Sequence, residues 1–238
     1  MNTNPAARLR TLGLWPVWQL RDSGLSEPAP ATQPELGSVA DAAILPRATL
    51  TSPTTRIVEQ SDADPVSAMD WAALREAVRT CTRCPLHVTR TQGVLGVGDT
   101  KADWLVVGEA PGAEEDRQGE PFVGQAGKLL DAMLRAIGLA RGENVYIANI
   151  LKSRPPGNRD PKPEEAEACR PYLEREIALL PDLQIVVALG RIAFDAALRL
   201  YADLEPATFN PNLPAFAHNA ACSLGPGLPA LIASYHPS

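Results

Sequence analysis

The chain of 238 residues lacks several features that mark common protein classes. Aromatic residues make up 5% of it, and no apolar run reaches the ~18 residues that a membrane-spanning helix needs. Residues 1–30 contain no apolar signal-peptide core, and the net charge of −6 argues against a surface that is basic throughout. We therefore expect neither a membrane protein nor a secreted disulfide-rich or histone-like protein, but a cytoplasmic one.

Cysteine is also scarce, with four residues at Cys81, Cys84, Cys169 and Cys222. In a reducing compartment, thiols serve metal binding or catalysis more often than disulfides. Cys81 and Cys84 form a CxxC pair, which on its own is typical of a zinc site or of two exposed thiols.

Proline, in contrast, is abundant, with 23 residues that are unevenly placed. The stretch from Ser23 to Pro65 is rich in Ala, Thr, Ser and Pro and has no lasting hydrophobic period. Because such a segment cannot bury enough apolar surface to offset its ordering entropy, we predict that residues 1–66 are a largely disordered N-terminal extension. An apolar cluster that includes Trp15 and Trp18 indicates either local packing or a short motif that docks an unknown protein.

Residues 67–238 have the pattern of one folded domain. Apolar spacing predicts helices at 67–80, 124–139, 163–180 and 191–201, and short apolar runs predict strands at 103–108, 144–150, 182–190 and 228–238. This alternation is typical of a three-layer α/β/α fold around a central, mainly parallel sheet of four strands. We expect a monomer whose ligand binds beyond the carboxyl ends of the strands.

The segment that follows the first strand combines a Gly-Pro turn, four carboxylates and a phenylalanine in a loop. The carboxylates are Glu109, Glu114, Glu115 and Asp116, and the phenylalanine is Phe122. An ordinary strand-to-helix turn with an acidic helix start is the simpler interpretation. The combination nevertheless exceeds what helix capping requires, so we interpret this segment as part of a ligand site.

The ends of two later strands also carry polar residues. The second strand ends at Asn149, whose amide suits the edge of an amide-like ring. The next residues include Lys152, Arg154 and Arg159, which suit phosphate contact unless they form a merely solvated loop. The last strand ends at His236, a candidate hydrogen-bond donor on the same edge of the sheet.

Four motifs from Cys81 to Ser238 resemble, in order, those of the iron–sulfur uracil-DNA glycosylases, chiefly of family 4. They are CTRCPL (81–86), GEAPGAEEDRQGEPFVGQAG (108–127), NILKSRPPGNRDPKPEEAEAC (149–169) and HPS (236–238). From Glu174 onward the chain is also similar to the family 5 enzymes. The resemblance implies a DNA repair glycosylase that hydrolyses the N-glycosidic bond of uracil in DNA and leaves an abasic site.

The resemblance also implies the residue roles. Phe122 would stack on an extruded uracil, Asn149 would bond its amide edge, and Glu109 would line the pocket. His236 would stabilise the charge that develops on uracil O2, while Asn158 and Glu115 would position the attacking water. The resemblance further implies a [4Fe–4S] cluster held by four cysteines.

Two departures from the family pattern stand out. Cys81, Cys84 and Cys169 match three of the cluster ligands, but Ser153 occupies the fourth place, and a serine hydroxyl is a poor ligand for soft iron. Relatives also continue past HPS with a loop that wedges into the duplex and a closing helix, so we expect the C-terminal end of the domain to be missing.

Two other interpretations remain open at this stage. One is a non-catalytic relative that binds DNA or docks a partner, which Ser153 and the Trp cluster would suit. The other is a nucleotide-binding α/β protein with a phosphate on the GEAPG turn, although the four nearby acids would repel that phosphate.

Overall fold

A mixed sheet forms the centre of the protein. The computed structural model describes residues 64–238, and within them the strand order is β1-β3-β2-β4-β6-β5. The strands are β1 (Val97–Gly98), β2 (Trp104–Gly108), β3 (Val145–Asn149), β4 (Ile185–Leu189), β5 (Ala221–Ser223) and β6 (Ala230–Ser234). The four inner strands are parallel, as predicted, whereas β1 and β5 add antiparallel edges of two and three residues that are too short to give a hydrophobic period.

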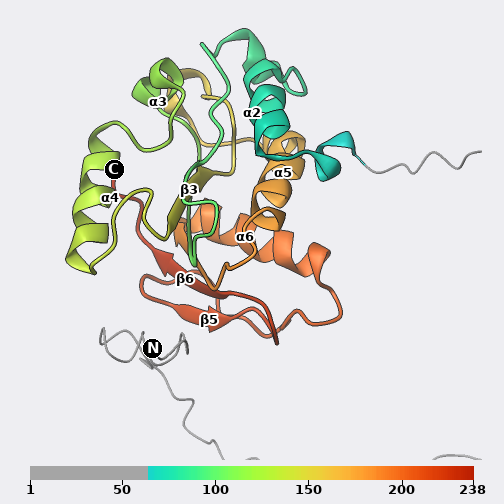
Figure 1. Ribbon diagram of the computed structural model, residues 1–238, viewed down its shortest axis with the longest axis vertical. Coiled ribbons are helices and arrows are strands. Elements are labelled where there is room, and N and C mark those ends of the chain that lie inside the picture. The colour runs from blue at the N-terminus through green and yellow to red at the C-terminus, as the bar shows by residue number, and fades with distance from the viewer. Residues whose placement is uncertain (1–63) are drawn as a thin grey trace, which may run out of the picture. The chain divides into compact units, whose positions relative to one another are not determined.

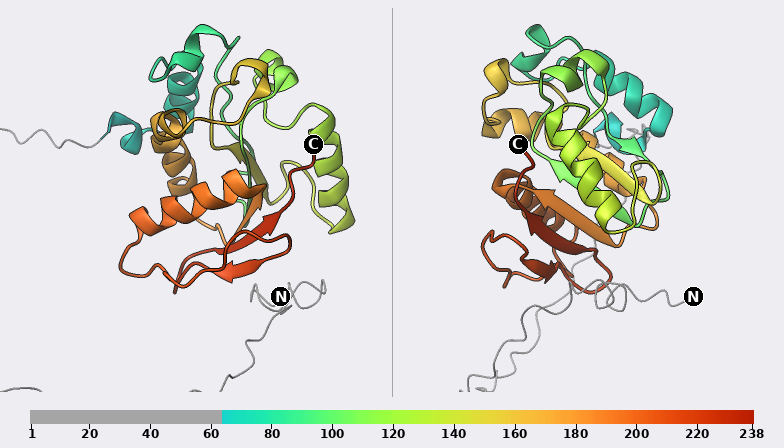
Figure 2. Two further views of the ribbon diagram at one scale, coloured as in Figure 1. Left: turned by 180° about the vertical axis from the view of Figure 1, so that it is seen from behind. Right: turned by 90° about the vertical axis from the view of Figure 1, so that its left-hand side faces the viewer.

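Helices cover the sheet on both sides, which confirms the predicted three-layer fold. They are α2 (Trp71–Thr80), α3 (Ala113–Gln118), α4 (Gln125–Ala136), α5 (Pro163–Ala178) and α6 (Arg191–Leu204). The two opposite views place α3 and α4 on one side of the sheet and α2, α5 and α6 on the other (Figures 1 and 2). The chain therefore crosses from one face of the sheet to the other between α4 and α5.

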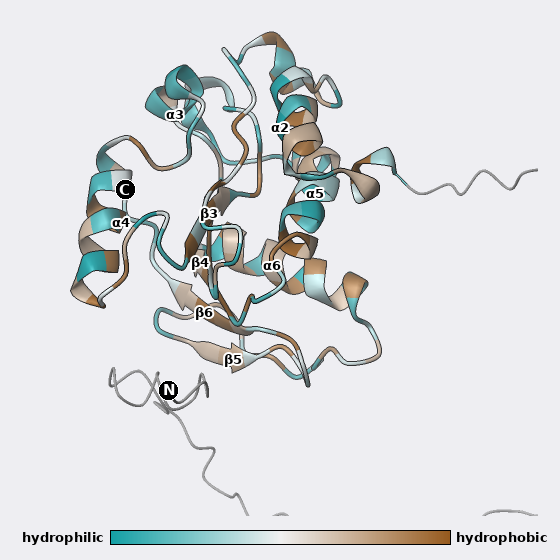
Figure 3. Cartoon of the chain, in the orientation of Figure 1, coloured by the Kyte–Doolittle hydropathy of each residue, from teal (hydrophilic) through white to brown (hydrophobic). Residues whose placement is uncertain are grey.

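The core forms because both faces of the inner strands are covered, so these strands are apolar along most of their length. Leu105 and Val107 of β2 pack in one cluster with Phe194 and Leu200 of α6. On α4, Leu130 is one of the residues buried on the helix's inner face. Figure 3 shows the result: the strands are mostly brown, whereas the helices alternate between brown and teal along their length.

The start of the domain differs from the prediction. Helix α2 begins at Trp71, because Asp70 caps it by accepting a hydrogen bond from the amide of Ala73 at 2.8 Å. The preceding residues Pro65–Ala68 form a separate 3-10 helix, in which Val66 is 1% exposed and belongs to the core. The domain thus includes at least Asp64–Val66, and the rest of the predicted extension, with its Trp cluster, lies outside the described residues.

The carboxyl ends of the inner strands converge on one edge of the sheet. Gly108 of β2 pairs in register with Asn149 of β3, and β6 ends two residues before His236. The next strand in the chain, β3, lies on one side of β2, and β4 lies on the other side. Open parallel sheets bind ligands at such a topological switch point. No helix in residues 64–238 is long and apolar enough to cross a bilayer.

Candidate functional site

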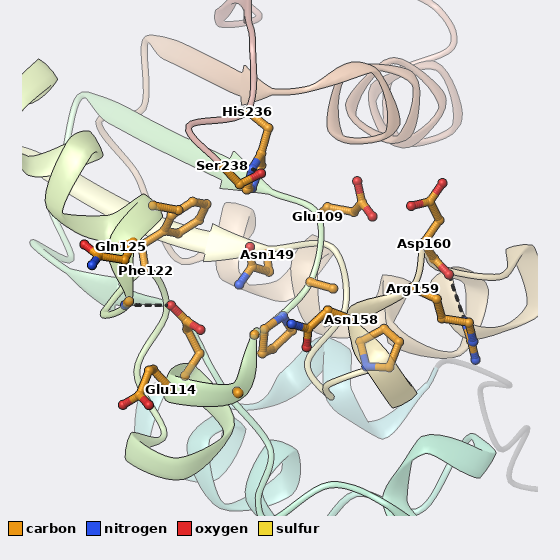
Figure 4. A pocket seen from close by; sticks show the side chains of 18 residues that line it. Glu109, Glu114, Phe122, Gln125, Asn149, Asn158, Arg159, Asp160, His236 and Ser238 are labelled. Atoms are coloured by element: carbon orange, nitrogen blue, oxygen red, sulfur yellow. Dashed lines mark hydrogen bonds between the residues drawn. The ribbon is translucent and has the colours of Figure 1, made fainter.

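A cavity of about 470 Å³ opens at this edge of the sheet (Figure 4), a volume in the range of small-molecule sites. Four parts of the chain contribute to its wall: the turn after β2, the loop before α4, the end of β3 with the following loop, and the residues after β6. The polar and aromatic side chains of the wall include Glu109, Glu114, Glu115, Phe122, Gln125, Asn149, Asn158, Arg159, Asp160, His236 and Ser238.

Asn149 supplies a buried amide to this cavity. It is the last residue of β3 and is 3% exposed, and its side-chain oxygen has no hydrogen-bond partner within residues 64–238. A buried acceptor without a hydrogen-bond partner destabilises the folded state, so such an atom is expected where a bound ligand donates the missing hydrogen bond. The amide of Asn149 is therefore available both to accept and to donate a hydrogen bond in the cavity.

Phe122 lies against the same floor. Phe122 is 5% exposed, and the centroid of its ring is 5.8 Å from that of the His236 ring. A Cβ atom on Gly108 would lie 2.4 Å from Cζ of Phe122 and 2.5 Å from Oδ1 of Asn149, so only glycine fits there. The absence of a side chain at Gly108 lets the ring and the amide approach the strand end together.

Glu115 organises the loop of Phe122. The carboxylate oxygen Oε1 of Glu115 accepts hydrogen bonds from the amides of Val123 and Gly124, each at 3.0 Å, and the side chain is buried. One carboxylate oxygen is thus already occupied by backbone donors. The predicted role of Glu115 with the attacking water is not tested by these contacts, which assign it a structural role in the loop.

Two further polar groups lie toward the loop that follows β3. Arg154 donates from Nε to the amide oxygen of Asn158 at 2.7 Å, which leaves the amide nitrogen of Asn158 as a donor. Burial raises the pKa of Glu109, and the negative charge of Asp160 raises it further. Figure 4 shows the carboxyl groups of Glu109 and Asp160 side by side.

His236 closes the cavity from the end of β6. Its Nδ1 lies 2.8 Å from the hydroxyl of Ser238. Burial lowers the pKa of His236, although Glu115 partly opposes this shift. Burial thus favours the neutral imidazole, and when Nδ1 of that form accepts from Ser238, Nε2 carries the proton.

The comparison with family models decides the family. Residues 95–238 match the model described as the uracil DNA glycosylase superfamily. The chain belongs to the uracil DNA glycosylase superfamily.

Individual relatives within the superfamily belong to the two families that the sequence motifs resemble. A Type-4 uracil-DNA glycosylase of Archaeoglobus fulgidus is 53% identical over 134 residues, which cover 56% of this chain and 65% of the relative. The Type-4 enzyme of Pyrobaculum aerophilum is 48% identical over 132 residues, covering 56% and 66%. The Type-5 enzyme of Thermus thermophilus is 34% identical over 200 residues, covering 71% and 88%. The predicted resemblance, chiefly to family 4 and also to family 5, is confirmed, and the chain spans just under two thirds of these Type-4 relatives.

Within this superfamily member, the cavity brings together Glu109, Glu115, Phe122, Asn149, Asn158 and His236, all of them predicted as site residues. Sequence reasoning missed Ser238 as the partner of the His236 imidazole. The HPS motif was the available signal, because it places a hydroxyl two residues after the histidine.

The predicted phosphate contact of Lys152 is wrong. Lys152 is 1% exposed, and its ammonium group forms an ion pair with Glu176 and donates to the carbonyl oxygen of Asn149 at 2.7 Å. Glu176 in turn accepts hydrogen bonds from Gly96 N at 2.7 Å and from the Tyr146 hydroxyl at 3.2 Å. Lys152 therefore stabilises the interior beneath the site and cannot reach DNA.

The two arginines of the same loop also make internal contacts. The guanidinium of Arg159 forms two hydrogen bonds with the carboxylate of Glu165 at the start of α5. Arg154 donates to Asn158, and no acidic partner is recorded for it in residues 64–238. A phosphate contact thus stays a prediction for both, with Arg154 the less engaged of the two.

The residues at the four cluster positions do not fit a cluster held by four thiolates. The hydroxyl of Ser153, which is 1% exposed, accepts a hydrogen bond from Arg90, and the same guanidinium donates to the carbonyl oxygen of Cys81. The hydrogen bond between Cys84 and Cys169 lowers the pKa of the Cys84 thiol. In the described part of the chain, no three His, Cys, Asp or Glu side chains form a group that could hold a metal ion.

Proposed function

We propose that this chain hydrolyses the N-glycosidic bond of uracil in DNA and leaves an abasic site. The observation that carries the proposal is the buried amide oxygen of Asn149, which has no hydrogen-bond partner within residues 64–238, beside the ring of Phe122. Uracil presents an N–H donor next to carbonyl acceptors on one edge and a flat face, and these match an amide and an aromatic ring. The names of the Type-4 and Type-5 relatives support the same activity.

Recognition would depend on the floor of the cavity. With the base stacked on Phe122, the Oδ1 atom of Asn149 would accept the N3–H of uracil, and its Nδ2 would donate to O4. Cytosine presents a lone pair at N3 and an amino group at position 4, so both contacts would oppose it. These two hydrogen bonds would therefore select uracil over cytosine.

Bond cleavage would depend on charge stabilisation. The departing uracil carries negative charge on its oxygens, and a neutral His236 with its proton on Nε2 would donate to O2. Asn158 would hold the attacking water through its amide nitrogen. As the C1′–N1 bond breaks and the water oxygen bonds to C1′, the water's proton would pass to the departing uracil anion. The half-buried Glu109 would face the sugar side of the cavity. All three side chains in this proposed step, those of His236, Asn158 and Glu109, come from the wall of the cavity.

A uracil-release assay tests the proposal. A duplex with one uracil is incubated with the full chain and then treated with alkali, which breaks abasic sites. We expect breakage at the uracil position and none in a matched cytosine duplex. An intact uracil strand at every protein concentration would contradict the proposal, and binding that is independent of uracil would then favour a non-catalytic DNA-binding role.

For the cofactor, we propose that Ser153 prevents stable binding of a four-thiolate [4Fe–4S] cluster. The Ser153→Cys variant is expected to raise the iron and acid-labile sulfide content of anaerobically purified protein, because it supplies the fourth soft ligand. Cys222→Ser is the matched control, since Cys222 lies on β5 with its thiol directed to the carbonyl oxygen of Leu231. Equal iron in wild type and Ser153→Cys would contradict this proposal.

A further inference from the structure

The loop that presents Phe122 has a strained backbone. The φ angle of Phe122 is 55°, in the left-handed region that residues other than glycine rarely adopt. Such a conformation persists only where surrounding contacts hold it, and it is common at ligand sites. The contacts that hold this peptide therefore decide where the ring of Phe122 lies.

Arg141 makes the contacts on the carbonyl side. It follows α4, nineteen residues after Phe122 in the chain, and its guanidinium donates to the carbonyl oxygens of Pro121 at 2.9 Å and Phe122 at 2.6 Å. Its Nε donates to Asp131 of α4 at 3.1 Å, and Glu120 lies 3.5 Å away. The planar guanidinium thus joins the loop of Phe122 to α4 through several fixed contacts.

Arg141 has no place in the wall of the cavity itself. On the other side of the same peptide, Glu115 accepts from the amides of Val123 and Gly124. Close packing adds to this, because a Cβ atom on Gly127 would lie only 1.8 Å from the oxygen of Phe122. Arg141 therefore has no direct contact with the cavity, and Phe122 is the cavity-lining residue that it touches.

We propose that Arg141 is a positioning residue that holds the Phe122 backbone in the left-handed conformation and so sets the plane on which the base stacks. The inference rests on the proposed function for its substrate, but its structural part concerns Phe122 alone. A lysine at this position would keep the charge but could not bridge two carbonyl oxygens and a carboxylate in one plane.

Kinetics provides the first test. In single-turnover reactions on the uracil duplex, Arg141→Ala is expected to excise uracil about 10-fold to 100-fold more slowly than wild type, with Arg141→Lys between the two. Arg170→Ala is the matched control, because Arg170 is also partly buried and pairs with Glu174 and Asp203 away from the cavity. If Arg141→Ala and Arg170→Ala lower the melting temperature and the rate to the same extent, the inference is overturned.

A spectroscopic test does not depend on activity. The chain has four phenylalanines, so labelling with 4-fluorophenylalanine gives four fluorine resonances, of which Phe122→Leu identifies one. We expect Arg141→Ala to shift or broaden the Phe122 resonance, and Arg170→Ala to leave it in place. An unchanged Phe122 resonance in Arg141→Ala would overturn the inference. If wild type releases no uracil, the proposed function fails, while the fluorine spectra still decide the role of Arg141.

Discussion

An Asn149→Ala variant is expected to excise uracil about a thousandfold more slowly than wild type under single-turnover conditions. In the proposed complex, the substitution would remove both the acceptor for N3–H and the donor for O4, from a residue that is 3% exposed. Polar contacts in such a water-poor site contribute more than they would in water. The measurement is the first-order rate constant of uracil release at saturating protein. At saturation, weaker DNA binding does not change this rate constant.

The control for this experiment is Asn212→Ala, which makes the same chemical change in an exposed loop before β5. It should keep the wild-type rate. Binding of a duplex without uracil should be the same for Asn149→Ala and wild type, since the cavity meets a base only after extrusion. A rate for Asn149→Ala within a few-fold of wild type would show that the amide does not read the base.

The second large effect concerns stability. The Glu176→Ala variant is expected to lower the free energy of unfolding by about 3–5 kcal/mol, because it leaves the ammonium group of Lys152 buried without its counter-charge. For a domain of this size the melting temperature should fall by roughly 10 °C. Urea unfolding followed by circular dichroism measures the first quantity, and a thermal scan measures the second.

A double variant distinguishes the effect of the unpaired buried charge on the free energy of unfolding from the effect of lost packing. Glu176→Leu combined with Lys152→Met should recover most of the lost stability, because neither charge is then buried. Glu76→Ala breaks an exposed ion pair with Arg79 on α2 and should hardly change the melting temperature. A double variant no more stable than Glu176→Ala would mean that packing, rather than the unpaired charge, causes the loss.

The sequence was sufficient to predict the inner sheet and the polar cavity residues at the strand ends. Each inner strand is a short apolar run, and polar residues lie at or just after its end: Asn149 is the last residue of β3, and His236 lies two residues after β6. Parallel strands bring these ends to one edge, so spacing along the chain translates into proximity. Prediction works here because the cavity is assembled from positions that the strands themselves define.

The orientation of the basic loop could not be predicted in this way. Lys152 and Arg159 have the charge that DNA phosphates require, but their actual partners, Glu176 and Glu165, come from α5. In the sequence these glutamates are simply acids within a helical pattern, and nothing local indicates that they point toward the loop. The same holds for Arg141, because its contact with Phe122 depends on how α4 packs.

The glycine at position 108 has a consequence for how the site meets its ligand. Because Phe122 and Asn149 both approach the backbone of Gly108, the stacking surface and the amide are already aligned in the free protein. A site of this kind loses little conformational freedom when it is filled. Under the proposed function, the energetic cost of base capture would fall mainly on the DNA, which must give up stacking and pairing, and a uracil in a mismatch or in a single strand would be the easiest to extrude.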